Sequence, residues 1–505
     1  MNNNLFSVLQ ACFPSDLNAR FVRAGSGHVY SYADMIARSA QYANALVGLG
    51  VAPGDRVAVQ VDKSFENLML YLGTLRAGGA YLPLNTAYTA AELAYFLGDA
   101  EPEVVVCREQ SEKEIAEVCG AARLVTLGDG GEGGSLLDLV NSASPEFEDV
   151  ERAKDDLAAI LYTSGTTGRA KGAMLTHENL SSNAEALSKT WQFTQSDVLL
   201  HALPIYHTHG LFTASNTILF AGASMIFLPR FDAEEVVGLL PEATTMMGVP
   251  TFYSRLLQVD GLTKELVQHI RIFISGSAPL SPELHKDFEA RTGHAILERY
   301  GMTETGMNTS NPFEGARRPG TVGFALPGVE LRIAAPETGK ELPKGEVGVI
   351  EVRGPNIFKG YWRMPEKTEE EFREDGFFIT GDLGVIDEQD YVNIVGRDKD
   401  LIISGGFNVY PAEIEAAIDA LEGVAESAVI GLPHPDFGEG VAAVVACKPG
   451  VSLEASDVIA PLGSQLAKFK QPKHVFFVDA LPRNAMGKIQ KKDLRELYAD
   501  TFKSD

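Results

Sequence analysis

Cysteine, tryptophan and long apolar runs are scarce in this chain. Its 505 residues include only 4 Cys and 2 Trp. The cysteines are too few for a disulfide framework and form no CxxC pair, so we expect reduced thiols and a cytoplasmic location. The N-terminal residues show no basic segment before an apolar one, which argues against a signal peptide. The longest apolar run, residues 219–229, is interrupted by glycine and serine, so we expect a buried strand there rather than a membrane span.

Positive charge is also in short supply. The chain carries 43 Lys and Arg against 68 Asp and Glu, a net charge of −25. Nucleic-acid backbones need clustered cations, and anionic membranes repel an acidic surface. We therefore expect neither nucleic acid nor a membrane as a partner. An anionic small molecule remains possible where local cations outweigh the overall field.

What the chain does contain is the composition of a globular protein, with 45% hydrophobic and 22% charged residues. Its length suits about three folding units, or one large domain with a small one. Within the first 150 residues, expected strands at 55–61 and 103–107 alternate with expected helices at 31–49 and 65–77. This alternation predicts an α/β fold with a mostly parallel sheet covered by helices.

The composition changes near residue 396. Short glycine-rich strands precede this point, and a segment of small strands and helices with its own apolar residues follows it. About a hundred residues can bury a small core, and the charged residues 397–400 suit a hinge. We expect an N-terminal domain at 1–396, a hinge at 397–400 and a C-terminal domain at 401–505.

The most informative segment is LYTSGTTGRAKG at 161–172. Glycines let backbone N–H groups approach phosphate oxygens, hydroxyl groups donate further hydrogen bonds, and Lys171 adds a positive charge. The spacing fits neither a Walker A motif nor a GxGxxG dinucleotide fingerprint. The segment therefore predicts a phosphate-binding loop of a different kind.

Six motifs in order resemble the AMP-forming acyl-CoA synthetase, luciferase and adenylation-domain superfamily. They are YTSGTTGRAKG, IFISGSAPL (272–280), YGMTET (300–305), TGDLG (380–384), GRDKDLIISGGFNVYP (396–411) and PRNAMGK (482–488). Two further segments, ALPIYHTHGLF and GVPTFYSRLL, resemble the malonyl-CoA synthetase branch. The resemblance spans nearly the whole chain. It implies an α/β fold: a large N-terminal domain of helix-covered sheets with a β-barrel subdomain, and a small mobile α+β C-terminal domain.

The resemblance implies a reaction in two steps. A carboxylate attacks the α-phosphate of ATP to give an acyl-AMP and pyrophosphate, and the thiol of coenzyme A then displaces AMP. ATP and coenzyme A are the implied substrates, together with Mg²⁺ and a short dicarboxylate. A ligase for another short-chain or aryl acid remains the alternative. A second alternative, from a different functional class, is a nucleotide-binding regulator that lacks catalysis.

The resemblance also implies the nucleotide and metal ligands. The β- and γ-phosphates would contact Thr163, Ser164, Gly165, Thr166, Thr167, Gly168 and Lys171. The adenine and α-phosphate would contact Gly276, Ser277, Ala278, Glu298, Arg299, Tyr300, Gly301, Met302 and Thr303. The ribose hydroxyls would contact Asp382 and Arg397, and Mg²⁺ would bind Thr163 and Glu304.

Lys488 is the implied catalytic residue of adenylation, contacting the carboxylate and the α-phosphate. Rotation about the hinge residue Lys399 would replace it with the loop 404–410 for the second step, and His207 would gate the pantetheine tunnel. The candidate CoA contacts are Ser404, Gly405, Gly406, Phe469, Lys470 and Lys473. A regulatory acetyltransferase acting on Lys488 would remove its charge.

The choice of acid depends on residues 250–259, which predict a helix beginning at a proline. Arg255 falls on the flank of the apolar arc of this helix. A poorly solvated cation needs a counter-charge, and an arginine fits a carboxylate in two places. Periodicity alone also permits an exposed flank arginine, but the resemblance favours a carboxylate ligand. The implied carboxylate site is Arg255 with Ser277, His207 and Met302, where Met302 would disfavour methylmalonate.

Overall fold

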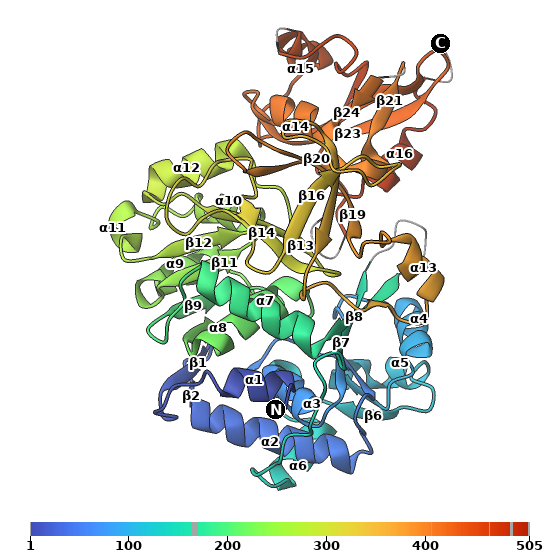
Figure 1. Ribbon diagram of the computed structural model, residues 1–505. Coiled ribbons are helices and arrows are strands. Elements are labelled where there is room, and N and C mark those ends of the chain that lie inside the picture. Colours follow the sequence, from blue (N-terminus) through green and yellow to red (C-terminus); the bar gives the residue numbers. More distant parts are fainter. Residues whose placement is uncertain (1, 164–169, 406, 464, 485–487, 503–505) are drawn as a thin grey trace. The chain divides into compact units, whose positions relative to one another are not determined.

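The computed structural model describes residues 2–163, 170–405, 407–463, 465–484 and 488–502 (Figure 1). They form two compact units. The first comprises Met1–Leu331 with Val352–Phe378, and the second comprises Arg332–Glu351 with Ile379–Asp505. The expected hinge at 397–400 lies inside the second unit, and its role in a rotation stays a prediction.

The first unit contains a seven-stranded sheet in the order β18-β8-β7-β4-β3-β5-β6. Its strands are β3 (Arg56–Gln60), β4 (Ala80–Pro83), β5 (Val104–Cys107), β6 (Arg123–Thr126), β7 (Leu157–Thr163), β8 (Lys171–Thr176) and β18 (Gly360–Tyr361). Strand β3 pairs in parallel with both β4 and β5. The parallel sheet predicted from the alternation in the first 150 residues is confirmed.

Helices α1 (Leu5–Gln10), α2 (Tyr32–Gly48) and α3 (Phe65–Arg76) belong to this part of the chain. The predicted helices at 31–49 and 65–77 are confirmed to within a residue or two at each end. Helix α2 begins at a capping box in which Ser31 and Asp34 satisfy each other's backbone N–H groups. Gly73 lets α3 approach α2, because a Cβ at this position would lie 2.5 Å from Cβ of Tyr42.

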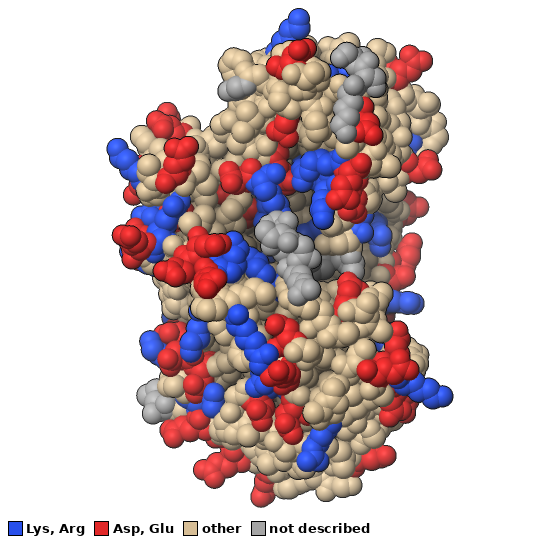
Figure 2. Space-filling view, turned by 90° about the vertical axis from the view of Figure 1, so that its right-hand side faces the viewer, with Lys and Arg blue, Asp and Glu red and all other residues tan. Residues whose placement is uncertain are grey.

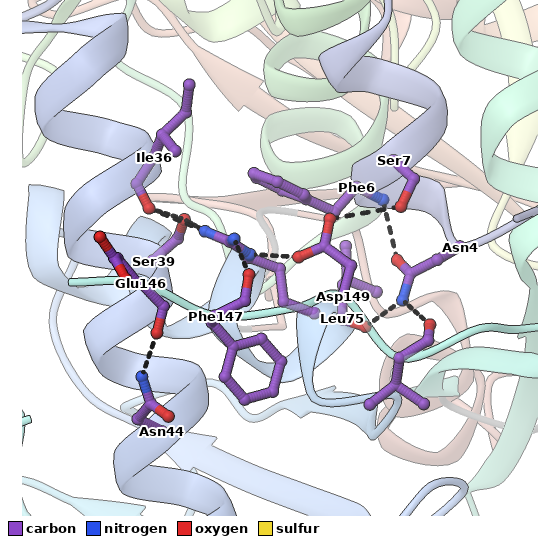
Figure 3. Close-up of polar contacts among 12 residues, drawn as sticks. Asn4, Phe6, Ser7, Ile36, Ser39, Asn44, Leu75, Glu146, Phe147 and Asp149 are labelled. Carbon is purple, nitrogen blue, oxygen red and sulfur yellow. Dashed lines mark hydrogen bonds and ion pairs between the residues drawn. The ribbon is translucent and has the colours of Figure 1, made fainter. Parts of the chain in front are cut away.

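Polar side chains fasten α1 to this core (Figure 3). The side-chain amide of Asn4 donates to the carbonyl of Leu75 at 2.6 Å. The buried guanidinium of Arg76 donates to Asp149 Oδ1 at 2.5 Å and to the carbonyl of Ile36 at 2.7 Å. A buried cation is tolerated when a carboxylate and carbonyls satisfy it, as they do here.

A second sheet of the first unit has nine strands in the order β15-β14-β13-β12-β11-β9-β10-β1-β2. These are β1 (Arg20–Ala24), β2 (Val29–Ser31), β9 (Val198–His201), β10 (Ser224–Phe227), β11 (Thr245–Gly248), β12 (Ile272–Ser275), β13 (Leu297–Met302), β14 (Gly306–Ser310) and β15 (Phe324–Ala325). The strands from β10 to β13 run parallel. Ligands commonly bind at the carboxyl ends of such strands, and the SGSAPL and YGMTET motifs lie at the ends of β12 and β13.

The remaining helices of the first unit cover these sheets (Figure 1). They are α4 (Ala90–Ala100), α5 (Glu112–Ala116), α6 (Ser135–Ser142), α7 (His177–Thr190), α8 (Thr217–Ala221), α9 (Ala233–Leu239), α10 (Pro250–Leu256), α11 (Lys264–Val267), α12 (Pro282–Thr292) and α13 (Pro365–Glu370). The strand expected at 219–229 is wrong in its first half. That half ends helix α8, and Gly222 closes the helix with a φ of +63° before β10 begins.

The second unit carries a mixed sheet built from β21 (Ile402–Ser404), β22 (Phe407–Val409), β23 (Val424–His434), β24 (Gly438–Cys447) and β25 (His474–Val478). Alternate residues of β23 face opposite sides. Val429 packs in a core with helices α14 (Pro411–Asp419) and α15 (Ala455–Leu462), whereas Ile430 packs in a core with α16 (Lys491–Leu497). The sheet is therefore covered on both faces.

A further sheet has four strands in the order β16-β17-β19-β20, and the expected β-barrel subdomain stays a prediction. Its strands are β16 (Glu330–Ala334), β17 (Gly348–Arg353), β19 (Phe378–Ile386) and β20 (Val392–Arg397). In the part of the chain that the structure describes, no helix is long and apolar enough to cross a membrane. Figure 2 shows acidic side chains spread over the face in view, with basic side chains interspersed among them.

Candidate active site

The predicted phosphate-binding segment joins two adjacent antiparallel strands. Thr163 at the end of β7 is paired with Lys171 at the start of β8, so the chain leaves and returns at one point. Five of the predicted phosphate ligands lie outside the described residues: Ser164, Gly165, Thr166, Thr167 and Gly168. Their roles remain predictions.

Lys171 lies in a cluster of charged and hydroxyl groups. Its Nζ is 2.8 Å from Oε1 of Glu371 and 3.9 Å from the ring centroid of Tyr361. The hydroxyl of Tyr361 is 2.6 Å from Glu371 Oε2 and 3.1 Å from Glu304 Oε1. Sequence reasoning missed Glu371 and Tyr361. Glu371 ends an acidic run that looks like a solvated helix face, and no local spacing connects it to Lys171.

Glu304 has the properties of a cation ligand. Its side chain is buried, and burial raises its pKa above the ordinary value. The hydroxyl of Thr163 lies 3.5 Å from its Oε1. Mg²⁺ binds through one or two carboxylates and keeps its other positions for water and substrate phosphates, so this pair fits it. Among the described residues no cluster of three or more His, Cys, Asp or Glu could hold a metal by itself.

A second group of polar residues lies beyond the carboxyl end of β12. Ser277 has a φ of +72°, rare for a residue with a side chain, and its Oγ lies 3.1 Å from Nδ1 of His209. His209 begins a π-helical segment, His209–Asn216, of a kind often found at functional sites. His207 Nδ1 accepts the backbone N–H of His209 at 3.3 Å. The motif that contains His207 therefore supplies a second histidine, which sequence reasoning did not assign.

Arg299 on β13 is a buried cation. Only 3% of the residue's surface is exposed to solvent. Within the described part of the chain, Nε and Nη2 have no hydrogen-bond partner. Burial lowers the pKa of Arg299 to about 9, so the guanidinium stays protonated at neutral pH. Gly276 provides its space, because a Cβ there would lie 2.3 Å from Arg299 Cζ.

The neighbouring Glu298 does not neutralise Arg299 by contact. Successive side chains on a strand point to opposite faces. Glu298 Oε1 accepts the backbone N–H of Leu280 at 3.1 Å, and Oε2 has no partner among the described residues. Burial raises the pKa of Glu298 to about 8. The guanidinium of Arg299 is thus a buried positive charge with unused donors.

Arg255 is placed differently from the expectation. The predicted low solvation of its side chain is wrong, because Arg255 is exposed. Tyr253 and Leu256, three residues apart, mark the buried face of α10, and Arg255 lies off that face. In the described structure its guanidinium has no ion pair. Its role as a carboxylate ligand stays a prediction.

In the second unit, Asp382 and Arg397 face each other across β19 and β20. Arg397 Nε lies 2.8 Å from Oδ1 of the buried Asp382. The structure therefore brings the two predicted ribose ligands together, although ribose contact itself stays a prediction. Lys399 lies just beyond, in a single 3₁₀ turn, Asp398–Asp400.

The candidate CoA residues also lie in the second unit. Ser404 is buried, Gly405 has a φ of +60°, and Phe469 stacks on Phe407 with centroids 4.6 Å apart. Lys470 pairs with Glu413 at 2.7 Å, and Lys473 Nζ lies 4.2 Å above the ring of Phe437. Gly406 lies outside the described residues. CoA contact stays a prediction for all six residues.

The remaining predicted nucleotide residues follow β12 or lie on and just after β13. They are Ala278, Tyr300, Gly301, Met302 and Thr303. Tyr300 is buried, and Met302 is half-buried at the end of its strand. Lys488 is exposed, and its backbone pairs with that of Asn484.

Comparison with known families matches both parts of the chain. Residues 12–362 match the AMP-binding enzyme family, and residues 413–488 match the AMP-binding enzyme C-terminal domain. The chain belongs to the AMP-binding enzyme family. This membership agrees with the order of motifs and with the two units of the structure.

Relatives of this AMP-binding enzyme differ in the acids that their names report. A malonate–CoA ligase of Arabidopsis thaliana is 33% identical, covering 98% of this chain and 89% of the relative. A long-chain-fatty-acid–CoA ligase of Mycobacterium tuberculosis is 36% identical, covering 93% of both chains. The ATP-bound crystal structure of MatB from Rhodopseudomonas palustris is 60% identical, covering 99% of this chain and 100% of its own, with a TM-score of 0.97.

Proposed function

We propose that this AMP-binding enzyme joins malonate to coenzyme A. ATP and malonate give malonyl-AMP and pyrophosphate, and the CoA thiol then displaces AMP to give malonyl-CoA. Family membership supports the reaction type. Overall identity to the curated relatives does not select the acid, because the malonate and long-chain ligases are similarly distant. The acid is therefore argued from the site.

The observation that carries the proposal is that Nε and Nη2 of the buried Arg299 have no hydrogen-bond partner among the described residues. A buried cation without a counter-charge is costly, and an arginine fits a carboxylate with two parallel hydrogen bonds. Malonate has one carboxylate to be adenylated and a second, beyond one methylene group, to pair with Arg299, which the resemblance assigns to the nucleotide instead. A fatty or simple aryl acid would leave Arg299 unpaired. Arg255, being exposed, is the weaker candidate for this carboxylate.

Charge on the phosphates of ATP is met by the cluster around Lys171. Lys171 is the positive group at the phosphate-binding segment, and Thr163 and Glu304 would bind Mg²⁺. Mg²⁺ supplies neutralisation of charge on the phosphate oxygens. Lys488 would contact the reacting carboxylate and the α-phosphate, with Asp382 and Arg397 at the ribose. Rotation about Lys399 would then exchange Lys488 for the CoA residues.

Two further proposals concern the cell. We place the enzyme in the cytoplasm, where its four free cysteines stay reduced. Acetylation of Lys488 by an acetyltransferase would block adenylation by removing the ammonium charge. The exposure of Lys488 supports this, since a modifying enzyme needs access to the side chain.

The direct test is pyrophosphate release with ATP, CoA and a panel of acids: malonate, methylmalonate, succinate, acetate, butyrate and benzoate. We expect malonate to give the highest kcat/KM, with methylmalonate lower because Met302 limits space. Preference for a monocarboxylate would support the alternative ligase instead. No pyrophosphate with any acid would support a non-catalytic regulator.

A further inference from the structure

Lys488 lies at the edge of a short antiparallel pairing between residues 482–484 and 488–490, which we call the hairpin; the residues between its two arms lie outside the described part of the chain. Arg483 and Ile489 form an antiparallel bridge, and the backbone N–H of Gln490 donates to the carbonyl of Pro482 at 2.8 Å. The side chain of Asn484 accepts the backbone N–H of Lys488 at 2.9 Å. An isolated two-stranded hairpin is marginally stable in water. These hydrogen bonds alone therefore do not fix the position of Lys488 relative to the rest of the second unit.

Two ion pairs attach the ends of this hairpin to the rest of the second unit. In its first arm, Arg483 pairs with Glu426 on β23. After it, Lys491 Nζ lies 2.6 Å from Oε1 of Glu415 on α14, and both side chains are more than four-fifths buried. Glu415 Oε1 also accepts the backbone N–H of Val429 at 2.7 Å. Glu415 thus ties the hairpin to a strand whose position the core already fixes.

A third carboxylate lies near Glu415 and Glu426, so Lys491 and Arg483 also offset repulsion among the carboxylates. Asp419 lies one turn after Glu415 on α14 and is half-buried. Burial, together with the charges of Glu415 and Glu426, raises its pKa to about 7, against a lowering by hydrogen bonds to Ser427. Loss of either cation would leave carboxylates facing one another in a poorly solvated region. The more deeply buried pair of Lys491 with Glu415 therefore resists separation more than an exposed ion pair does.

We propose that Glu415 with Lys491, and Glu426 with Arg483, are positioning residues that hold the hairpin in the register that presents Lys488 for adenylation. The inference rests on the proposed role of Lys488. A shift of about 1 Å in a catalytic group can lower a rate roughly 10²-fold. The effect should be confined to the half-reaction that uses Lys488.

The test measures the two half-reactions separately in the full-length enzyme. Pyrophosphate release with ATP and malonate reports adenylation, and CoA consumption with supplied malonyl-AMP reports thioester formation. We expect Lys491→Met and Glu415→Gln each to lower kcat of adenylation by roughly 10- to 100-fold. The KM for ATP and the rate of thioester formation should change less than about twofold. Lys491→Arg should restore most of the adenylation rate, because it keeps the charge.

Lys492, the residue after Lys491, provides a matched control. Lys492 pairs only loosely with Glu496, at 3.7 Å, with both side chains about 70% exposed. Lys492→Met should leave both half-reactions unchanged. If Lys491→Met does not fold, Arg483→Met tests the other end of the hairpin through a more exposed pair.

Lys488→Ala separates the two proposals. If it abolishes adenylation while Lys491→Met and Arg483→Met leave adenylation intact, the positioning role is refuted and the catalytic role stands. If Lys488→Ala retains adenylation, the proposed role of Lys488 fails, and the positioning role with it. Equal loss of both half-reactions in Lys491→Met would show a merely structural contribution and overturn the inference.

Discussion

Nζ of Lys63 lies 2.9 Å from Nδ1 of His201, and both side chains are buried. His201 Nε2 lies 2.8 Å from the carbonyl of Gly210, which can only accept. Burial lowers the pKa of His201 well below its ordinary value, so the ring is neutral. Nε2 therefore carries the proton and Nδ1 accepts from Lys63. This chain of bonds fixes the first turn of the π-helical segment that contains His209.

Lys63→Met tests that chain. The substitution leaves Nδ1 of His201 buried without a donor, which costs about 1–3 kcal/mol. We expect a lower free energy of unfolding in urea. We also expect a higher KM for malonate with the KM for ATP unchanged, because the π-helical segment positions His209 beside Ser277. Unchanged stability together with an unchanged KM for malonate would contradict this account.

Gly276→Ala tests the space around Arg299. The added Cβ would lie 2.3 Å from Arg299 Cζ, closer than any real contact, so the guanidinium must move. We expect the ratio of kcat/KM for malonate to that for butyrate to fall at least tenfold. Gly238→Ala is the control, since a Cβ there meets nothing within 4 Å. A ratio unaffected by Gly276→Ala would show that Arg299 does not contact the acid.

Asp419→Asn tests the buried carboxyl of the second unit through pH. The pKa of Asp419 is about 7 in the folded protein against an ordinary 3.8. Between these values the unfolded chain releases a proton that the folded chain retains, so rising pH favours unfolding until about pH 7. Asparagine cannot ionise, so the variant does not lose this folding stability as the pH rises.

The variant should therefore gain stability relative to the parent, little at pH 4 and most at pH 8. Urea unfolding at the two pH values checks this. Asp436→Asn, at an exposed aspartate, should show no such trend. A difference between Asp419→Asn and the parent that does not depend on pH would count against the assigned burial of the carboxyl.

Local patterns predicted much of the fold. Helix α2 begins where Ser31 and Asp34 allow a capping box, and the parallel strands β3 and β5 follow apolar runs between helices. The run 219–229 was misjudged because apolar residues alone do not separate a buried helix from a strand. Only the left-handed conformation of Gly222 divides it.

The site residues were predictable where they come from one motif. They were not predictable where the interacting residues are far apart in the sequence. Thr163 and Lys171 come from one segment, but Glu371 reaches Lys171 from 200 residues away. Periodicity placed Arg255 on a helix flank without deciding its exposure. Arg299 stands immediately before the YGMTET motif, yet its two unpartnered nitrogens depend on Gly276 and on tertiary burial, which no local pattern reports.

The central claim is that Arg299 pairs with the second carboxylate of malonate. Its most direct test is the malonate-to-butyrate ratio of kcat/KM in the parent, Arg299→Gln and Arg255→Gln. Truncating one partner of a buried charge pair costs about 2–5 kcal/mol, or roughly 30-fold to several thousand-fold. We predict a fall of that size for Arg299→Gln and a change below about threefold for the exposed Arg255→Gln. An unchanged ratio in Arg299→Gln, with or without a fall in Arg255→Gln, would contradict the account.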